Sequence, residues 1–243
     1  MENEVPLSDG RLTPGVVRVG HTVRRPASAS SSFVAALLGD LQRAGFAGAP
    51  RHLGFDTADR EILSYLPGWV PARFQRWTDP QVAAAGSLLR SFHDATRGSR
   101  LAGRHPVVCH HDPGPNNTVF ADDIPAAFID FDTAAPGDPI EDLGYMAWTW
   151  CISSKASAPP ATVQAAQVRV LADAYGLDAS SRSRLIDAAL DRQDRNARWW
   201  HSHLAGPSPR VADDHTIAER IRWSKQEHAY TSANREAFDT ALG

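Results

Sequence analysis

The side chains best suited to chemistry lie in one loop near the middle of the sequence. A histidine, an aspartate and an asparagine occur there at the spacing His-x-Asp-x-x-x-x-Asn, as His110, Asp112 and Asn117. A carboxylate on a loop can accept or orient the proton of an attacking hydroxyl group, so Asp112 is the candidate general base. Aspartate is also a common turn former, and Asp112 taken alone could simply cap the turn at Pro113.

A second carboxylate follows at the end of an apolar run. Residues 126–132 read as a strand, and they carry Asp130 and then Asp132. Mg²⁺ prefers oxygen ligands and keeps several waters, so one carboxylate and one amide oxygen suffice beside a triphosphate. We therefore predict that Asn117 and Asp130 hold Mg²⁺, with Asp132 as a supporting carboxylate or auxiliary ligand. Singly, Asn117 could be a turn residue and Asp130 a solvated strand end; jointly these readings are weak.

The spacing of the loop and the aspartate after the next strand are typical of a phosphoryl-transfer site. His110 is not needed as a base there, and we expect it to pack behind the loop and to hydrogen-bond backbone groups. The neighbouring His111 is expected to be tolerated, with a smaller chance of contacting substrate. Asp138, directly before Pro139, is most simply the N-cap of a helix.

The elements that must position this loop begin with a small sheet. Residues 107–109 and 118–120 are apolar and β-branched, so strands are expected to flank the loop. Earlier in the chain, strands are expected at 15–19, 22–25 and 60–65, and the first dozen residues are expected to be loose. One helix, capped by Ser31 or Ser32 and ended by Gly45, should lie between these strands. The first ~65 residues thus form a small sheet with one helix.

The rest of the chain is mainly helical in pattern. The expected helices are residues 79–93, 139–150, 161–175, 181–204 and 213–238. The fold class is therefore α+β, with a small β-rich lobe, residues 1–66, and a larger helical lobe, residues 67–243. Functional sites tend to form in the cleft between two such bodies.

Composition excludes several classes of function. A formal charge of −3 over 243 residues argues against a general nucleic-acid binder. Two cysteines give neither a disulfide framework nor a zinc ligand set, so a reducing cytoplasm is the expected compartment. The sequence shows no secretion signal and no apolar run near the ~20 residues of a membrane span. The expected partner is a small molecule, with neither nucleic acid nor membrane involved, and the oligomeric state stays open.

These motifs resemble those of the aminoglycoside phosphotransferase and choline-kinase-like family of small-molecule kinases. The matching segments are His110-His111-Asp112 with Asn117, then Phe128-Ile129-Asp130-Phe131-Asp132, then Gly137-Asp138-Pro139 and the four residues after it. The resemblance implies a two-lobed protein-kinase-like fold, Asp112 as catalytic base, and Mg²⁺ on Asn117 and Asp130. It also implies that the backbone at Ser64, Tyr65 and Leu66 receives the base of ATP or GTP.

The first lobe departs from the family pattern. Such kinases place a strand lysine on the nucleotide phosphates and pair it with a helix glutamate. Here the matching strand has arginines, so Arg24, or less favourably Arg25, would replace the lysine, and residues 33–38 contain no acid. Arginine grips phosphate through a planar fork rather than as a point charge.

The acceptor site is expected in the helical lobe. Asp187, Asp191 and Asp194 fall at i, i+4 and i+7 on one face of a predicted helix, with Trp199 close by. That face could hold a polycationic acceptor by charge and by stacking. The alternative is a solvated acidic stripe balanced by neighbouring arginines, and the sequence favours this reading.

The leading interpretation is a Mg²⁺-dependent phosphotransferase that moves the γ-phosphate of ATP or GTP to a hydroxyl of a small molecule. A cationic antibiotic, an aminoglycoside or a tuberactinomycin-like peptide, is the first choice of acceptor. The alternative is a catalytically degraded kinase-like binding module, motivated by the missing lysine and glutamate. A third reading, a metal-dependent hydrolase using His110, His111 and Asp112, would need further ligands.

Overall fold

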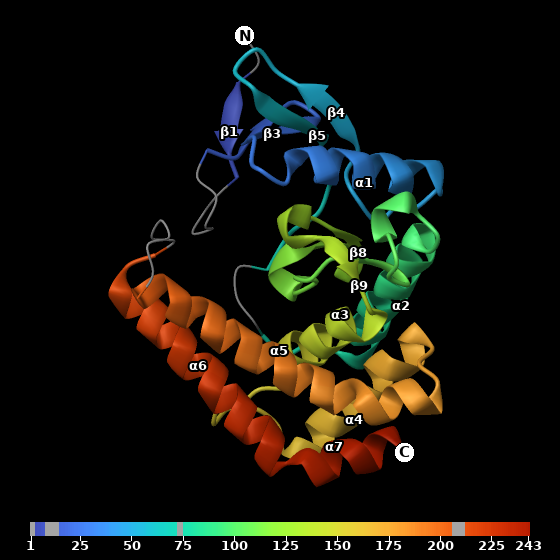
Figure 1. Ribbon diagram of the computed structural model, residues 1–243, viewed down its shortest axis with the longest axis vertical. Helices are drawn as coiled ribbons and strands as arrows, with labels where there is room; N and C mark the ends of the chain where they lie inside the picture. The colour runs from blue at the N-terminus through green and yellow to red at the C-terminus, as the bar shows by residue number, and fades with distance from the viewer. Residues whose placement is uncertain (1–2, 8–14, 72–74, 206–211) are drawn as a thin grey trace. The chain divides into compact units, whose positions relative to one another are not determined.

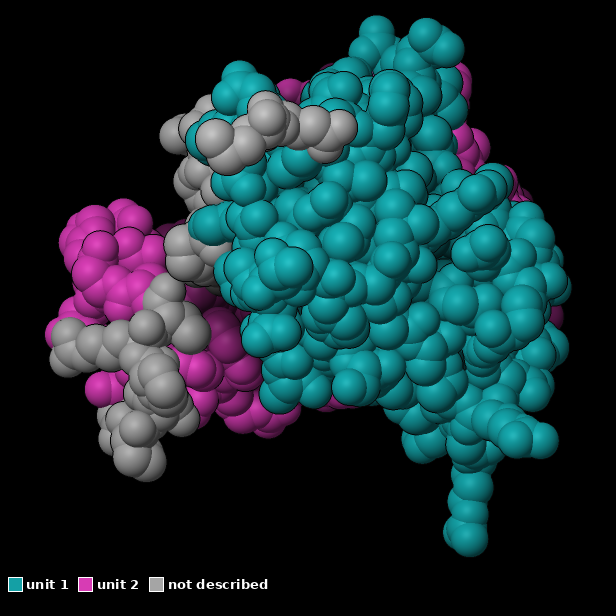
Figure 2. All heavy atoms as spheres, turned by 90° about the horizontal axis from the view of Figure 1, so that it is seen from above, with its two compact units in different colours: residues 1–73, 88–138 teal, residues 74–87, 139–243 magenta. Residues whose placement is uncertain are grey.

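The computed structural model describes residues 3–7, 15–71, 75–205 and 212–243. The chain divides into two compact units, coloured in Figure 2. Unit 1 comprises residues 1–73 and 88–138, and unit 2 comprises residues 74–87 and 139–243. The predicted lobes, 1–66 and 67–243, are a different division of the chain and stay a prediction. The predicted α+β class is confirmed, because a small antiparallel sheet is followed by a larger, mainly helical part.

The sheet of unit 1 has five antiparallel strands in the order β1-β2-β3-β5-β4 (Figure 1). Its strands are β1 (Glu4–Pro6), β2 (Val17–Val19), β3 (Thr22–Pro26), β4 (His52–Phe55) and β5 (Arg60–Ser64). The predicted strands 15–19, 22–25 and 60–65 are confirmed with small shifts at their ends. The expectation of a loose N-terminal segment is wrong for β1, whose three exposed residues form a strand by pairing with β2. Strand β4 was not expected from the sequence.

The helix beside this sheet is α1 (Ser31–Arg43), and it buries Val34, Leu37, Leu38 and Leu41. Its N-cap is Ser30 rather than the predicted Ser31 or Ser32. The Ser31 hydroxyl accepts a hydrogen bond from the Ser28 N–H at 2.8 Å, so it braces the turn before the helix instead. Gly45 follows the helix at φ 76°, in the left-handed region that ends helices, as expected.

Two further antiparallel strand pairs frame the central loop. Strand β6 (Val107–Cys109) pairs with β9 (Ala135–Gly137), and β7 (Thr118–Ala121) pairs with β8 (Ile124–Phe128). Asp122 and Asp123 join β7 to β8 with φ of 48° and 60°, the two left-handed residues of a type I′ turn. The predicted strand 126–132 is wrong at its end. It stops at Phe128, because Asp130 is left-handed and a 3₁₀ turn, η3 (Phe131–Thr133), follows.

Helices make up the remainder. They are α2 (Asp79–Thr96), η1 (Arg100–Ala102), η2 (Pro115–Asn117), α3 (Pro139–Met146), the π-helical turn η4 (Ala147–Cys151), α4 (Ala161–Tyr175), α5 (Ala179–Ala205), α6 (Asp214–Ala233) and α7 (Arg235–Leu242). The predicted helix 213–238 is in fact two helices, because the backbone turns at Asn234, whose side chain donates back to the Tyr230 carbonyl. Figure 1 shows α5 and α6 running side by side, and Trp200, Ile217 and Ile221 form a buried cluster between them.

Buried polar side chains fix the segment that follows η4 in unit 2. Gln164 accepts from the Ser153 N–H at 2.8 Å and donates to the Ser153 carbonyl at 3.1 Å. Glu227 accepts from the Ser154 N–H at 3.1 Å and from the Ser154 hydroxyl at 2.7 Å. Burial raises the pKa of Glu227 above its usual value, although the bonds from Ser154 act in the opposite direction.

Across the residues described, none of the helices combines the length and the apolar character that crossing a bilayer requires.

Two glycine-to-alanine substitutions should change stability in opposite directions. A methyl group at Gly144 on α3 would lie 2.5 Å from the backbone of Ala188 on α5, so the two helices would have to separate. We expect Gly144→Ala to lower the free energy of unfolding by about 1–3 kcal/mol. At Gly39 in α1 the nearest atom is the flexible end of Arg43 at 3.4 Å. Gly39→Ala should raise stability by about 0.5–1 kcal/mol, because the unfolded chain loses freedom.

Urea denaturation of both variants at fixed pH measures this difference. A neutral or stabilising effect of Gly144→Ala would show that α3 and α5 are not packed backbone to backbone at this point.

Glu227 should make stability depend on pH. Because its pKa is raised in the folded protein, the unfolded chain releases this proton at a lower pH than the folded protein does. The contribution of Glu227 to stability is therefore fully present below the pKa it has in the unfolded chain. It is lost as pH rises through the higher pKa it has in the folded protein. Glu227→Gln keeps an oxygen for the Ser154 donors and removes the titration.

We expect the free energy of unfolding of Glu227→Gln minus that of wild type to increase as pH rises from about 4 to 7, because only wild type loses stability through this group. Chemical denaturation at several pH values measures it, and Glu236→Gln at the first turn of α7 is the control. A difference that is constant with pH would contradict the assignment.

Candidate functional site

The loop that holds the candidate base lies between the end of β6 and the start of β7, all within unit 1. The side-chain amide of Asn117 donates to the Asp112 carbonyl at 3.0 Å and to its carboxylate oxygen Oδ2 at 2.7 Å. Asn117 is buried, whereas Asp112 is partly exposed. The amide therefore fixes the orientation of the Asp112 carboxylate while the carboxylate keeps access to solvent. The Asn117 oxygen Oδ1 accepts a long bond, 3.3 Å, from Asn116.

His110 is fully buried and both of its ring nitrogens lie within hydrogen-bonding distance of backbone groups. The Asp112 N–H donates to Nδ1 at 3.3 Å, so Nδ1 is an acceptor. Nε2 then carries the proton and donates to the Ile129 carbonyl at 3.1 Å. The ring also packs against Phe131, with centroids 4.6 Å apart. These contacts support a structural role for His110 and speak against its use as a metal ligand, which weakens the hydrolase reading.

Asp130 is tied to the same loop through its neighbour. The N–H of Ile129 donates to the Asn117 carbonyl at 2.9 Å, and the Ile129 carbonyl receives the His110 ring. Asp130 follows with a left-handed backbone, φ 64° and ψ 64°, and its side chain is 42% exposed. His111 is also left-handed, at φ 61°. Non-glycine residues in this region are strained, and such residues cluster at functional sites.

The donor set fits a hard divalent cation. Asn117 offers an amide oxygen whose present bond is long, and Asp130 offers an exposed carboxylate. Both are oxygen ligands of the kind that Mg²⁺ takes from proteins while it keeps its own waters. The structure thus supports the fit of these residues to Mg²⁺, and their assignment as ligands stays a prediction.

Strand β3, which is expected to carry the phosphate-binding cation, has two arginines with different partners. Arg25 is buried, and its Nε donates to Glu61 at 2.6 Å while its terminal nitrogens lie 2.6 Å from Asp132 and 3.6 Å from Asp130. Burial lowers the pKa of the Arg25 guanidinium. The charges of Asp132 and Glu61, with hydrogen bonds to both, outweigh burial and raise the pKa above its usual value.

Arg24, the arginine favoured by sequence, pairs elsewhere. It donates to the Thr22 hydroxyl at 2.7 Å and lies 3.7 Å from Asp56. Its assignment to the nucleotide stays a prediction. Glu61 was not expected at the site, because in the sequence it stands beside Arg60 at the start of the strand, where charged residues are ordinary.

Backbone groups of the predicted base-binding segment are partly engaged. The Ser64 N–H donates to the Arg51 carbonyl, and the Tyr65 N–H donates to the His21 carbonyl, each at 2.9 Å. The guanidinium of Arg18 stacks on the Tyr65 ring, 3.8 Å from its centroid. A base edge bound here would therefore hydrogen-bond to other backbone groups of this segment, which continues through Leu66.

The predicted acceptor-binding residues lie on α5, in unit 2, and are exposed. Each of the three carboxylates has an arginine partner: Asp187 pairs with Arg235 at 2.6 Å, Asp191 with Arg195, and Asp194 with Arg198 at 2.8 Å. The hydrogen bond from Arg235 holds the pKa of Asp187 below its usual value. Trp199, 44% exposed, packs against His203 with centroids 4.2 Å apart. The pairing agrees with the alternative reading, a balanced acidic stripe.

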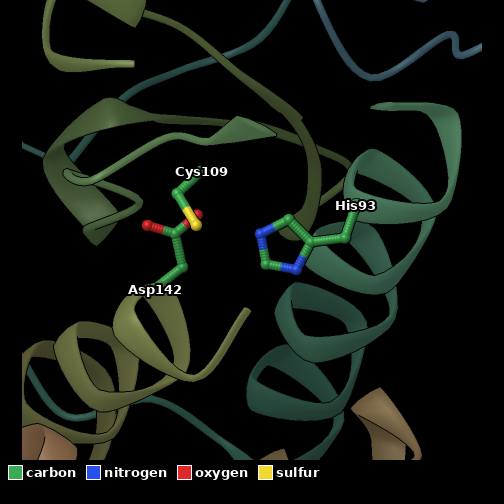
Figure 3. A group of neighbouring side chains, drawn as sticks. All are labelled: His93, Cys109 and Asp142. Carbon is green, nitrogen blue, oxygen red and sulfur yellow. The ribbon is translucent and has the colours of Figure 1, made fainter. Parts of the chain in front are cut away.

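A separate pair of soft ligands is buried in unit 1. Figure 3 shows His93 of α2 and Cys109 of β6 facing each other, with ligand atoms within 4.8 Å, and also draws the buried Asp142 of α3 in unit 2. The Cys109 thiol donates to the Asp138 carbonyl at 3.3 Å, so it is protonated. Nitrogen and sulfur are not ligands that Mg²⁺ prefers, and this pair is distinct from the predicted magnesium ligands.

Comparison with known proteins assigns the chain to a family. The profile of the "Phosphotransferase enzyme family" matches residues 17–185. A trifolitoxin immunity protein of Rhizobium leguminosarum bv. trifolii is 32% identical over 264 aligned positions, which cover all of both chains.

Solved structures agree in fold. A choline/ethanolamine kinase family protein from Mesorhizobium loti superposes with a TM-score of 0.61, at 18% identity, over 93% of this chain and 88% of its own. A spectinomycin phosphotransferase bound to ADP and spectinomycin gives 0.62, at 12% identity, over 91% and 88%. A gentamicin complex of APH(2″)-IIa gives 0.61, at 12% identity, over 95% and 93%. The chain therefore belongs to the phosphotransferase enzyme family and has its two-lobed, protein-kinase-like fold.

Proposed function

We propose that the protein transfers the γ-phosphate of ATP or GTP to a hydroxyl group of a small molecule. The observation that carries this proposal is the pair of hydrogen bonds by which Asn117 holds Asp112. The backbone of Asn117 is also bonded to Ile129, the residue directly before Asp130. A fixed carboxylate next to two oxygen ligands is the constellation that phosphoryl transfer requires, because catalysis there is mainly positioning and charge stabilisation.

Each residue has a defined task in this proposal. Asp112 accepts the proton of the acceptor hydroxyl as the hydroxyl oxygen bonds to the γ-phosphorus. The bond from that phosphorus to the β,γ-bridging oxygen breaks, and the nucleoside diphosphate leaves. Asn117 and Asp130 hold Mg²⁺, which would neutralise charge on the phosphates when bound. His110 keeps the loop in place through its bond to the Ile129 carbonyl rather than taking part in proton transfer. The base of the nucleotide lies against Ser64, Tyr65 and Leu66, and Arg24 is the strand cation that sequence assigns to its phosphates.

The acceptor class rests on weaker support. The similar chain from Rhizobium is named for immunity to trifolitoxin, and two of the similar folds are bound to gentamicin and to spectinomycin. We therefore favour an antibiotic bearing a free hydroxyl, an aminoglycoside or a tuberactinomycin-like peptide, modified in the cytoplasm as a resistance reaction. Asp187, Asp191, Asp194 and Trp199 remain the proposed contacts, but a cationic acceptor would have to displace their arginine partners.

The alternative is a kinase-like module that binds without catalysis. The observation in its favour is that β3 has arginines in place of the lysine, and that the first turn of α1 has no acid. Titration of the protein with ATP and GTP, with and without Mg²⁺, separates the two. Metal-dependent nucleotide binding followed by γ-phosphate loss supports the kinase, and binding without any phosphate loss to acceptor or water supports the module.

Asp112→Asn should abolish most of the activity and little else. The amide still accepts the bond from Asn117 but cannot take up a proton, so we expect kcat to fall by about 10²–10⁴-fold. Nucleotide affinity and unfolding temperature should stay close to wild type. The assay is a phosphorylation screen across cationic antibiotics with labelled nucleotide.

The matched control is Asp123→Asn, which makes the same change in the turn after β7, where asparagine is well tolerated. Asp112→Asn turning over at the wild-type rate would show that the base has been assigned to the wrong residue.

A further inference from the structure

Three carboxylates from two segments of unit 1, strand β5 and the turn η3 with its N-cap, surround the guanidinium of Arg25. Glu61 of β5 receives Nε at 2.6 Å, Asp132 of η3 receives a terminal nitrogen at 2.6 Å, and Asp130 lies 3.6 Å from the other. The first carboxylate is fully buried, whereas the side chains of Asp132 and Asp130 are 32% and 42% exposed. The cluster is thus closed on the Glu61 side and open on the side of the predicted magnesium ligand.

Strand register brings Arg25 and Glu61 together. Strands β3 and β5 are antiparallel neighbours, and Arg25 lies directly opposite Glu61, so both side chains leave the same face of the sheet. Arg24 lies opposite Ile62 and, by the alternation of a strand, leaves the other face. Only one of the two arginines can therefore reach Asp130 and Asp132 from this strand.

Helix α1 cannot supply a carboxylate in place of Glu61. Its only acid is Asp40, which lies in the second half of the helix. Asp40 accepts the Ser99 hydroxyl at 2.5 Å and also pairs with Arg43. The helix glutamate that pairs with a strand lysine in similar kinases thus has no counterpart on α1, and a strand glutamate is bonded to the strand cation.

The charge of the cluster matches one divalent cation rather than the nucleotide itself. Three carboxylates and one guanidinium leave a formal charge of −2, which one divalent cation neutralises. Guanidinium offers five N–H donors in a planar fork, and Nε is committed to Glu61. The 3.6 Å separation from Asp130 is too long for a hydrogen bond, so this edge of the fork can turn to the oxygens of a phosphate.

We propose that Glu61 is a positioning residue that holds Arg25 as the phosphate-binding cation of this site. An arginine–glutamate pair built on two adjacent strands then replaces a lysine–glutamate pair that joins a strand to a helix. The ligand is the polyphosphate of the nucleoside triphosphate, and the inference rests on the proposed kinase function. It assigns the phosphates to Arg25 rather than to Arg24.

The test compares nucleotide affinity with fold stability. In Arg25→Met/Glu61→Gln both charges of the buried pair are removed together, so no buried charge is left unpaired. We expect calorimetric titration with Mg-ATP and Mg-GTP to show at least tenfold weaker binding, with circular dichroism like wild type. Arg25→Lys keeps the positive charge without the fork, and should bind more tightly than the double variant. If the double variant does not fold, the nucleotide affinity of Arg25→Lys relative to wild type tests the role of Arg25.

Glu61→Gln alone tests the positioning role. The Arg25 charge remains but its orientation is loosened, so KM for the nucleotide should rise several-fold more than kcat falls. The control is Arg60→Met, which removes another ion-paired arginine of β5, one that bonds Asp56 and Glu4 and none of the site carboxylates. Arg60→Met should leave nucleotide affinity unchanged.

The outcomes separate this inference from the function on which it rests. Wild type that binds no nucleotide overturns both. Wild type that binds and transfers phosphate, with Arg25→Lys and the double variant binding as tightly, overturns the inference alone. A larger loss of affinity in Arg24→Met than in Arg25→Met/Glu61→Gln, two variants that each remove an arginine charge, likewise overturns it and restores Arg24 as the phosphate ligand.

Discussion

The geometry of the site depends on the backbone of one residue, Ile129. Its N–H is bonded to the Asn117 carbonyl and its carbonyl receives the His110 ring, so the loop and the segment after β8 are fastened at two points. Asn117 in turn orients Asp112, and Asp130 takes its left-handed conformation directly after the fastened residue. Because Ile129 uses only main-chain atoms, side-chain identity at this position matters less than the buried imidazole that reaches it.

That arrangement explains which parts of the site were predictable. The loop residues are close in sequence, and their spacing carries the information that places them between two apolar strands. Long helices were predictable for a similar reason, since α4 and α5 repeat apolar residues over several turns. What failed was set by distant partners. Strand β1 exists because it pairs with β2, and Glu61 meets Arg25 across 36 positions through a register that no local pattern specifies.

Ends of elements were the other source of error. The strand predicted to run through residue 132 stops at Phe128, because Asp130 and the 3₁₀ turn after it reach back to the loop and to Arg25. The helix predicted to run to 238 breaks at Asn234, whose side chain bonds a carbonyl of the preceding turn. At Asn234 a short polar side chain competes with regular backbone structure, and at Asp130 the backbone turns left-handed; hydrophobic periodicity registers neither.

The paired acidic stripe of α5 bears on how readily this helix could gain a cation-binding surface. Its three carboxylates are each matched by an arginine, two of them one helical turn away and one on α7. A new cation-binding surface there requires no gain of acidic residues. Loss of a single arginine, such as Arg198, would uncover a carboxylate already in place, so one mutational step separates a neutral surface from an attractive one.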